Sequence, residues 1–145
     1  MSVAQIVTVA RAWIGTPYVH QAARRGAGCD CLGLLRGVLA EVSGTALQKV
    51  PAYTPDWSEP QGDEVLWKAA AEQLIAKPIE DAQGGDVVLF RMRQGAVAKH
   101  VGLQAETGLR PTFIHAYQGH GVCESAFSAP WQRRLVARFA VPDFS

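Results

Sequence analysis

Apolar residues recur at helical spacing in three stretches of the first half of the chain. Residues 3–14 carry them every three or four positions, and this pattern predicts an amphipathic helix that ends at Gly15. The same spacing over residues 31–42 predicts a second helix that ends near Gly44, where glycine suits a left-handed cap. A third helix is predicted over residues 63–76. The first half of the chain is therefore mainly helical.

The pattern changes from helix to strand after Pro78. A short apolar run at residues 87–91 predicts a strand buried on both faces. Shorter strands follow, separated by turns, at residues 100–105, 112–117, 122–125 and 135–141. Short strands joined by turns favour an antiparallel sheet of about five strands. Helices followed by strands predict an α+β domain.

Composition limits the classes of protein that this chain can represent. Its 145 residues are 48% hydrophobic with a formal net charge of +1, which predicts one soluble domain over residues 1–145. Neither a nucleic-acid partner nor disorder is indicated. Apolar runs are too short for membrane insertion, and we expect no secretory signal because the first residues lack a basic region followed by an apolar one.

Cys31 is the leading candidate for a nucleophile. Asp30 is a suitable N-cap, so Cys31 is expected in the first turn of the second helix, where the helix dipole favours a thiolate. Gly33 would let this turn pack closely against its neighbours. The alternative is that Cys31 is a small buried apolar residue at a helix start.

A catalytic cysteine needs a base, and two histidines lie on predicted strands. His100 begins one strand and His115 lies in the next, so adjacent antiparallel strands can place the two imidazoles side by side. His100 would then accept the Cys31 proton while His115 fixes its tautomer. Each histidine taken alone is more typical of a structural residue with satisfied hydrogen bonds in the core or at a sheet edge. His20 and His120 are expected on the surface or at the rim of a pocket.

Three further candidates have a structural alternative. Tyr18 could donate a hydrogen bond to an oxyanion or simply pack at the surface. Cys123 is expected in the core, and Cys29 lies just outside the helix. A zinc site from the three cysteines and a histidine is disfavoured, because the Cys-x-Cys spacing fits the usual ligand pairs poorly.

Five motifs in order resemble the NlpC family of papain-like cysteine peptidases over residues 11–139. They are Gly-Thr-Pro-Tyr, Asp-Cys-x-Gly, Gly-Asp-Val-Val-Leu-Phe, Lys-His-Val-Gly and Phe-Ile-His-Ala. Further details resemble the phage-encoded branch: Leu32 where cellular members usually have serine, Tyr-Thr-Pro-Asp-Trp at 53–57, Gly-Val-Cys-Glu-Ser at 121–125, and Trp-Gln-Arg-Arg at 131–134.

The resemblance implies a papain-like fold and a function. It assigns Cys31 as nucleophile, His100 as base, His115 as the third polar residue and Tyr18 near the oxyanion. The implied reaction is hydrolysis of an amide bond in peptidoglycan stem peptides, with no metal ion or cofactor. The expected carrier is a phage or phage-like tail or baseplate, which would bring the enzyme to the bacterial cell wall.

Two other functions stay open. The chain could be a structural tail-tip component that uses the fold for interaction, although the complete set of Cys31, His100 and His115 argues against this. It could also be an acyltransferase on the same scaffold. The proline-rich segment 49–62 carries Tyr53 and Trp57, which could anchor a partner or cover the core.

Overall fold

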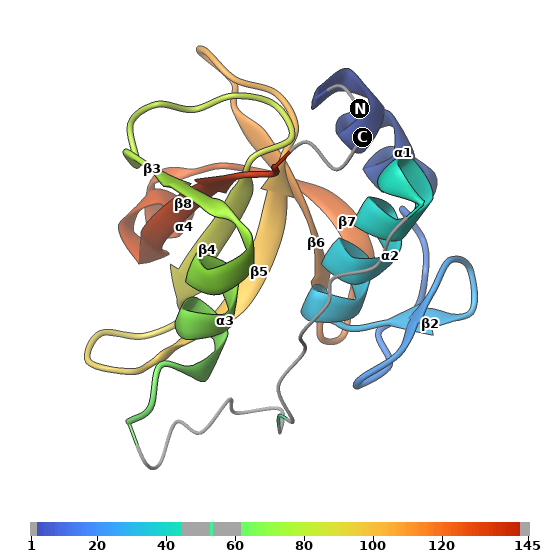
Figure 1. The fold of residues 1–145 in the computed structure, drawn as a ribbon, viewed down its shortest axis with the longest axis horizontal. Helices are drawn as coiled ribbons and strands as arrows, with labels where there is room; N and C mark the ends of the chain where they lie inside the picture. The colour runs from blue at the N-terminus through green and yellow to red at the C-terminus, as the bar shows by residue number, and fades with distance from the viewer. Residues whose placement is uncertain (1–2, 45–52, 54–61, 143–145) are drawn as a thin grey trace.

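The computed structural model describes residues 3–44, 53 and 62–142 as an α+β fold. Figure 1 shows helices α1 and α2 packed beside one another on one face of the main sheet. The elements, in chain order, are α1 (Val3–Ala12), β1 (Ala23–Arg24), β2 (Gly28–Cys29), α2 (Cys31–Ser43), α3 (Val65–Gln73), β3 (Ile75–Lys77), β4 (Val87–Arg91), β5 (Ala98–Gln104), β6 (Thr112–Tyr117), β7 (Gly121–Ala126), α4 (Ala129–Arg134) and β8 (Leu135–Ala140).

The predicted ends of the second helix are confirmed. Asp30 is the N-cap of α2, and its Oδ1 accepts a hydrogen bond from the Gly33 backbone N–H at 2.7 Å. Gly44 caps the other end in the left-handed conformation, with φ of 75°. A Cβ at Gly33 would lie 1.8 Å from the Ala22 carbonyl oxygen, so the close packing expected there requires glycine.

The main sheet has six antiparallel strands in the order β3-β8-β4-β5-β6-β7, one more than expected. The extra strand is β3, which occupies the end of the segment predicted as helix at residues 63–76. Helix α3 ends at Gln73, and Ile75 pairs instead with Ala140 of β8. Pairing with a distant strand prevails here over the local helical spacing.

Three other elements were missed because each is very short. Strands β1 and β2 have two residues each and form a small separate sheet. Helix α4 has six residues, with Pro130 in its first turn. Neither length is enough for a periodic pattern to emerge from the sequence.

Strand β4 is buried on both faces, as predicted, because the sheet has a core on each side. Val87 and Leu89 belong to the main core, which lies between the sheet and helices α1 and α2. Val88 and Phe90 belong to a second cluster with Phe113 and Phe127, against which Trp131 of α4 packs. Within the described ranges, no helix is long and apolar enough to cross a membrane.

Candidate active site

Cys31 lies at the point where the short β2 strand turns into α2. Residues 28–29 pair with β1, and Cys29 also forms a bridge with Tyr18, so this approach to the helix is held on two sides. The Cys31 side chain is buried, and its Sγ lies 3.9 Å from the backbone oxygen of Lys99 on β5. The thiol therefore faces the start of the strand that carries His100.

The two histidines lie side by side, as predicted. His100 on β5 and His115 on β6 are both buried, and His100 Nε2 lies 2.7 Å from His115 Nδ1. Because Nε2 of His100 is engaged in this pair, Nδ1 is the ring nitrogen that remains for a thiol proton. His115 Nε2 in turn lies 2.9 Å from the Ser125 hydroxyl on β7. A hydrogen-bonded row therefore crosses three neighbouring strands.

Gly102 allows β5 and β6 to approach closely beside this row. A Cβ at this position would lie 3.0 Å from the Ile114 backbone oxygen and 3.3 Å from His115 Cβ. A larger residue would push the strands apart or displace the His115 ring. The glycine of the Lys-His-Val-Gly motif thus has a packing reason two residues from His100.

Aromatic rings enclose both imidazoles. The Trp131 ring centroid lies 5.7 Å from that of His100 and 5.2 Å from that of His115, and Phe90, Phe113 and Tyr117 complete the wall. Burial lowers the pKa of His100 to about 3, with a further contribution from His115. Burial and His120 lower the pKa of His115 to about 4. Both rings are neutral at pH 7.

The resting thiol is neutral as well, which corrects the expectation of a thiolate. Burial raises the pKa of Cys31 to about 12, and the neighbouring Asp30 charge also raises it. Backbone N–H groups, including that of Val101, lower the pKa in part. A helix dipole contributes at most about 2 kcal/mol, whereas burial can shift a pKa by several units. Desolvation therefore prevails.

Asp30 has a second role besides capping α2. Its Oδ2 accepts hydrogen bonds from the Tyr53 hydroxyl at 2.6 Å and from the Gln21 backbone N–H at 2.7 Å. His20 Nδ1 lies 3.7 Å from the same oxygen. One buried carboxylate thus connects three segments of chain beside the thiol.

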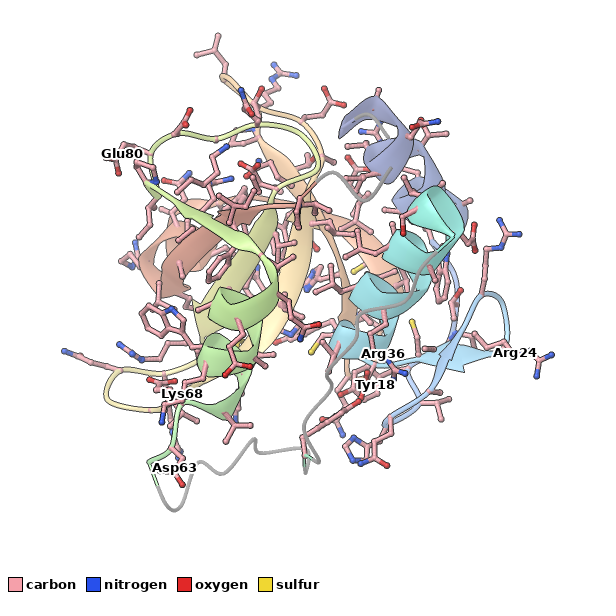
Figure 2. The ribbon with its side chains drawn as sticks, viewed as in Figure 1. Tyr18, Arg24, Arg36, Asp63, Lys68 and Glu80 are labelled. Carbon is pink, nitrogen blue, oxygen red and sulfur yellow. The ribbon has the colours of Figure 1, made fainter. Side chains whose placement is uncertain are left out.

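These residues surround one cavity of about 260 Å³. Cys31 and His100 both line it, so the structure brings the predicted nucleophile and base to the same space. Tyr18 lines it too, and Figure 2 shows this residue close to the N-terminal end of α2. Burial, followed by the charges of Cys31 and Asp30, raises the pKa of Tyr18 to about 12, so its hydroxyl stays protonated and able to donate.

His20 and His120 lie where the sequence predicted, whereas Cys123 does not. His20 lines the cavity, as expected for a rim residue, and His120 is exposed and stacks on Tyr117. Cys123 is only half-buried rather than in the core, because its neighbour Val122 takes the inward position of β7. Cys29 is fully buried in β2. No three His, Cys, Asp or Glu side chains within the described ranges are placed to hold a metal ion.

Comparison with known families identifies the chain. Residues 15–139 match the sequence model of the NlpC/P60 family. The chain belongs to the NlpC/P60 family. No curated protein sequence matches it.

Solved NlpC/P60 structures share the fold. The NlpC/P60 domain of the peptidoglycan hydrolase SagA is 22% identical with a TM-score of 0.69, covering 97% of this chain and 100% of that one. A lipoprotein-like NLP/P60 protein from Staphylococcus aureus is 25% identical (TM-score 0.65; 96% of this chain, 41% of that one). A Bacillus cereus family member is 19% identical (TM-score 0.67; 95% and 39%). The chain therefore spans about two fifths of the length of the last two proteins.

Three residues of this NlpC/P60 site were not assigned a site role from sequence. Ser125 appeared only within a motif, and the alternation of β7 could have placed it on the His115 face. Asp30 was assigned as a cap alone. Tyr53 was considered a partner-binding anchor, yet it lines the cavity and packs against the core, as the alternative proposed. Trp57 lies outside the described residues.

Proposed function

We propose that this chain is a cysteine peptidase domain that hydrolyses an amide bond in peptidoglycan stem peptides. The observation that carries the proposal is a single cavity that both Cys31 and His100 line. Nδ1 of His115 lies 2.7 Å from Nε2 of His100 and can orient its ring. A nucleophile, a base and a group that orients the base are the parts that acyl transfer needs. Family membership and the fold shared with the SagA domain support the substrate class.

The first half of the reaction begins from neutral groups. As Cys31 Sγ bonds to the carbonyl carbon, its proton moves to His100 Nδ1 and the carbonyl electrons move to oxygen. The Cys31 backbone N–H and the Tyr18 hydroxyl stabilise this oxyanion. When the intermediate collapses, the C–N bond breaks, His100 protonates the leaving amine, and a thioester remains on Cys31.

The second half uses the same groups. His100 accepts a proton from water as the water oxygen attacks the thioester, and the collapse releases the acid and the Cys31 sulfur, which regains the proton. His115 accepts the Nε2–H of His100 and donates its own Nε2–H to Ser125, which keeps Nδ1 of His100 as the basic nitrogen. The His100–His115 bond strengthens when His100 carries its transient charge.

Digestion of purified peptidoglycan, with released fragments identified by mass spectrometry, tests this proposal. Cys31→Ala is the matched control. The expected result is new peptide termini at one type of bond with the wild type and none with the variant. Ligated rather than hydrolysed products would indicate an acyltransferase, and no products at all would favour a structural role.

We also propose that a phage or phage-like tail carries the domain to the cell wall. The support is the sequence likeness to the phage-encoded branch, especially Leu32 after the cysteine and the Trp-Gln-Arg-Arg motif. Quantitative mass spectrometry of purified particles from the source organism tests this. Finding the chain free in lysates and absent from particles would contradict it.

A further inference from the structure

Four arginines line a second hollow, which shares a residue with the catalytic cavity. This groove of about 550 Å³ lies between the β4–β5 loop and α4, and it includes Arg91, Arg93, Arg133 and Arg134. Met92 lines both the groove and the catalytic cavity. The two hollows therefore adjoin one another at Met92.

We propose that this arginine groove binds a carboxylate-bearing part of the peptide substrate that flanks the scissile bond. The inference rests on the proposed peptidase function, and it assigns a recognition role to the Trp-Gln-Arg-Arg segment. Guanidinium groups present paired N–H donors that match the two oxygens of a carboxylate.

The charge of the groove is strongly one-sided. No acidic side chain is found among the described residues that line it. Glu64 pairs with Arg91 from outside the lining, at 3.2 Å, and its other oxygen accepts the Ala98 backbone N–H. A groove that concentrates cations in this way favours an anionic occupant.

Helix α4 connects the groove to the catalytic histidines. The guanidinium of Arg134 lies 5.1 Å from the Trp131 ring centroid, in a cation–π contact. The same Trp131 ring packs on His100 and His115. One short helix thus supports the catalytic pair with its aromatic residue and presents its arginines beside it.

A peptide fits this placement better than a nucleic acid. The chain has 14 basic and 13 acidic residues, so it lacks the general positive charge of a nucleic-acid-binding domain. The cations are concentrated next to the cavity where the peptide bond would be cleaved. Stem peptides carry free carboxylates close to their amide bonds, so a substrate seated in the cavity can reach the groove.

The test compares two synthetic stem peptides of identical sequence, one with free carboxylates and one with these groups amidated. We expect wild-type kcat/KM to favour the acidic peptide by about tenfold or more, the scale of a charge-assisted hydrogen bond. The variant Arg133→Gln should reduce this preference toward one, mainly through KM, because Arg133 is an exposed residue that lines the groove. Arg133 has no contact with Trp131 among the described residues, so the catalytic pair keeps its support.

Arg110→Gln is the matched control. This exposed arginine lies in the β5–β6 turn, which Figure 1 shows at the opposite end of the sheet from the β4–β5 loop. It removes the same charge without touching the groove, so the preference should stay at the wild-type value. An equal loss of preference in this control would overturn the groove assignment, because it would indicate a general charge effect.

Binding to an inactive Cys31→Ala protein separates this inference from the proposed function. Arginine-dependent affinity for the acidic peptide without turnover by the wild type would support the groove and contradict the peptidase. Turnover with equal kcat/KM for both peptides would support the peptidase and overturn the groove. Arginine-dependent binding of polyphosphate or single-stranded DNA, with no difference between the peptides, would also overturn it.

Discussion

The helix side of the active site, built by Asp30 and Cys31, and the sheet side, built by His100 and His115, bury polar groups in different ways. The helix side holds a carboxylate that accepts hydrogen bonds from distant loop segments. The sheet side holds a row of neutral rings and a hydroxyl, set by strand register and enclosed by aromatic residues. The first side concentrates negative charge next to the thiol, and the second excludes charge.

Both sides therefore oppose a resting thiolate–imidazolium pair. Burial and Asp30 raise the pKa of Cys31, and burial lowers the pKa of His100. In the proposed mechanism, the thiolate forms only during attack, when the proton moves directly to His100. The helix start therefore positions the sulfur, while the sheet positions the proposed base.

Removing either reacting group should have the largest effect. Cys31→Ala and His100→Ala should each lower kcat by at least about 10³-fold. Fragment release from peptidoglycan measures the loss, and circular dichroism checks that each variant is folded. Substantial activity in a folded Cys31→Ala protein would exclude Cys31 as nucleophile.

In the proposed mechanism, His115 orients the base without taking the thiol proton, so its loss should lower kcat less than the loss of His100. We expect His115→Asn to lower kcat by roughly tenfold to a hundredfold, the scale for groups that orient a functional histidine. His100→Ala serves as the comparison. If His115→Asn loses as much activity or more, the two histidines exchange roles.

Acid should destabilise the folded protein through the two buried histidines of the sheet side. The pKa values of His100 and His115 are lowered in the folded state to about 3 and 4, from 6.5. Below about pH 6.5 the unfolded chain binds protons that the folded chain does not, so stability falls as pH decreases toward 4. The expected loss between pH 7 and 5 is about 2 kcal/mol per histidine, measured by urea unfolding. His115→Gln should make the free energy of unfolding depend less on pH. An unchanged pH dependence would contradict the lowered pKa of His115 in the folded state.

Charge removal on the helix side should activate the thiol. Asp30→Asn retains a good N-cap, but it removes the charge that raises the pKa of Cys31. Alkylation of Cys31 at pH 8 should accelerate, by up to about tenfold for each pKa unit removed. Peptide mapping should locate the label at Cys31. An unchanged labelling rate at Cys31 would contradict this role of the Asp30 charge.

The smallest expected effect is at the end of the histidine row. Ser125→Ala removes one neutral hydrogen bond to His115, of about 1 kcal/mol, so kcat should fall about fivefold. Ser125→Thr keeps the hydroxyl and should restore most of the rate. An equal loss in both variants would indicate a packing role for Ser125.

Local patterns predicted much of the fold and the centre of the site. Asp30 and Gly44 mark the ends of α2 because caps depend on neighbouring residues, and the apolar run 87–91 indicates β4 because both of its faces are covered. The order of helices and strands predicted the α+β class. Strand β3 was not predictable from a local pattern, because Ile75 of β3 pairs with Ala140 of β8, which lies 65 positions further along the chain.

The residue types available for the chemistry, and the helix that begins at Cys31, could be recognised in the amino-acid sequence. Three features depend on how the whole chain packs: Asp30 accepts the Tyr53 hydroxyl, Ser125 completes the histidine row, and four arginines meet beside the cavity that Cys31 lines. It also reversed the expected direction of the Cys31 pKa shift. Hydrogen bonds between distant segments and the loss of solvent around a buried group arise only when the whole chain packs, so no local pattern contains them.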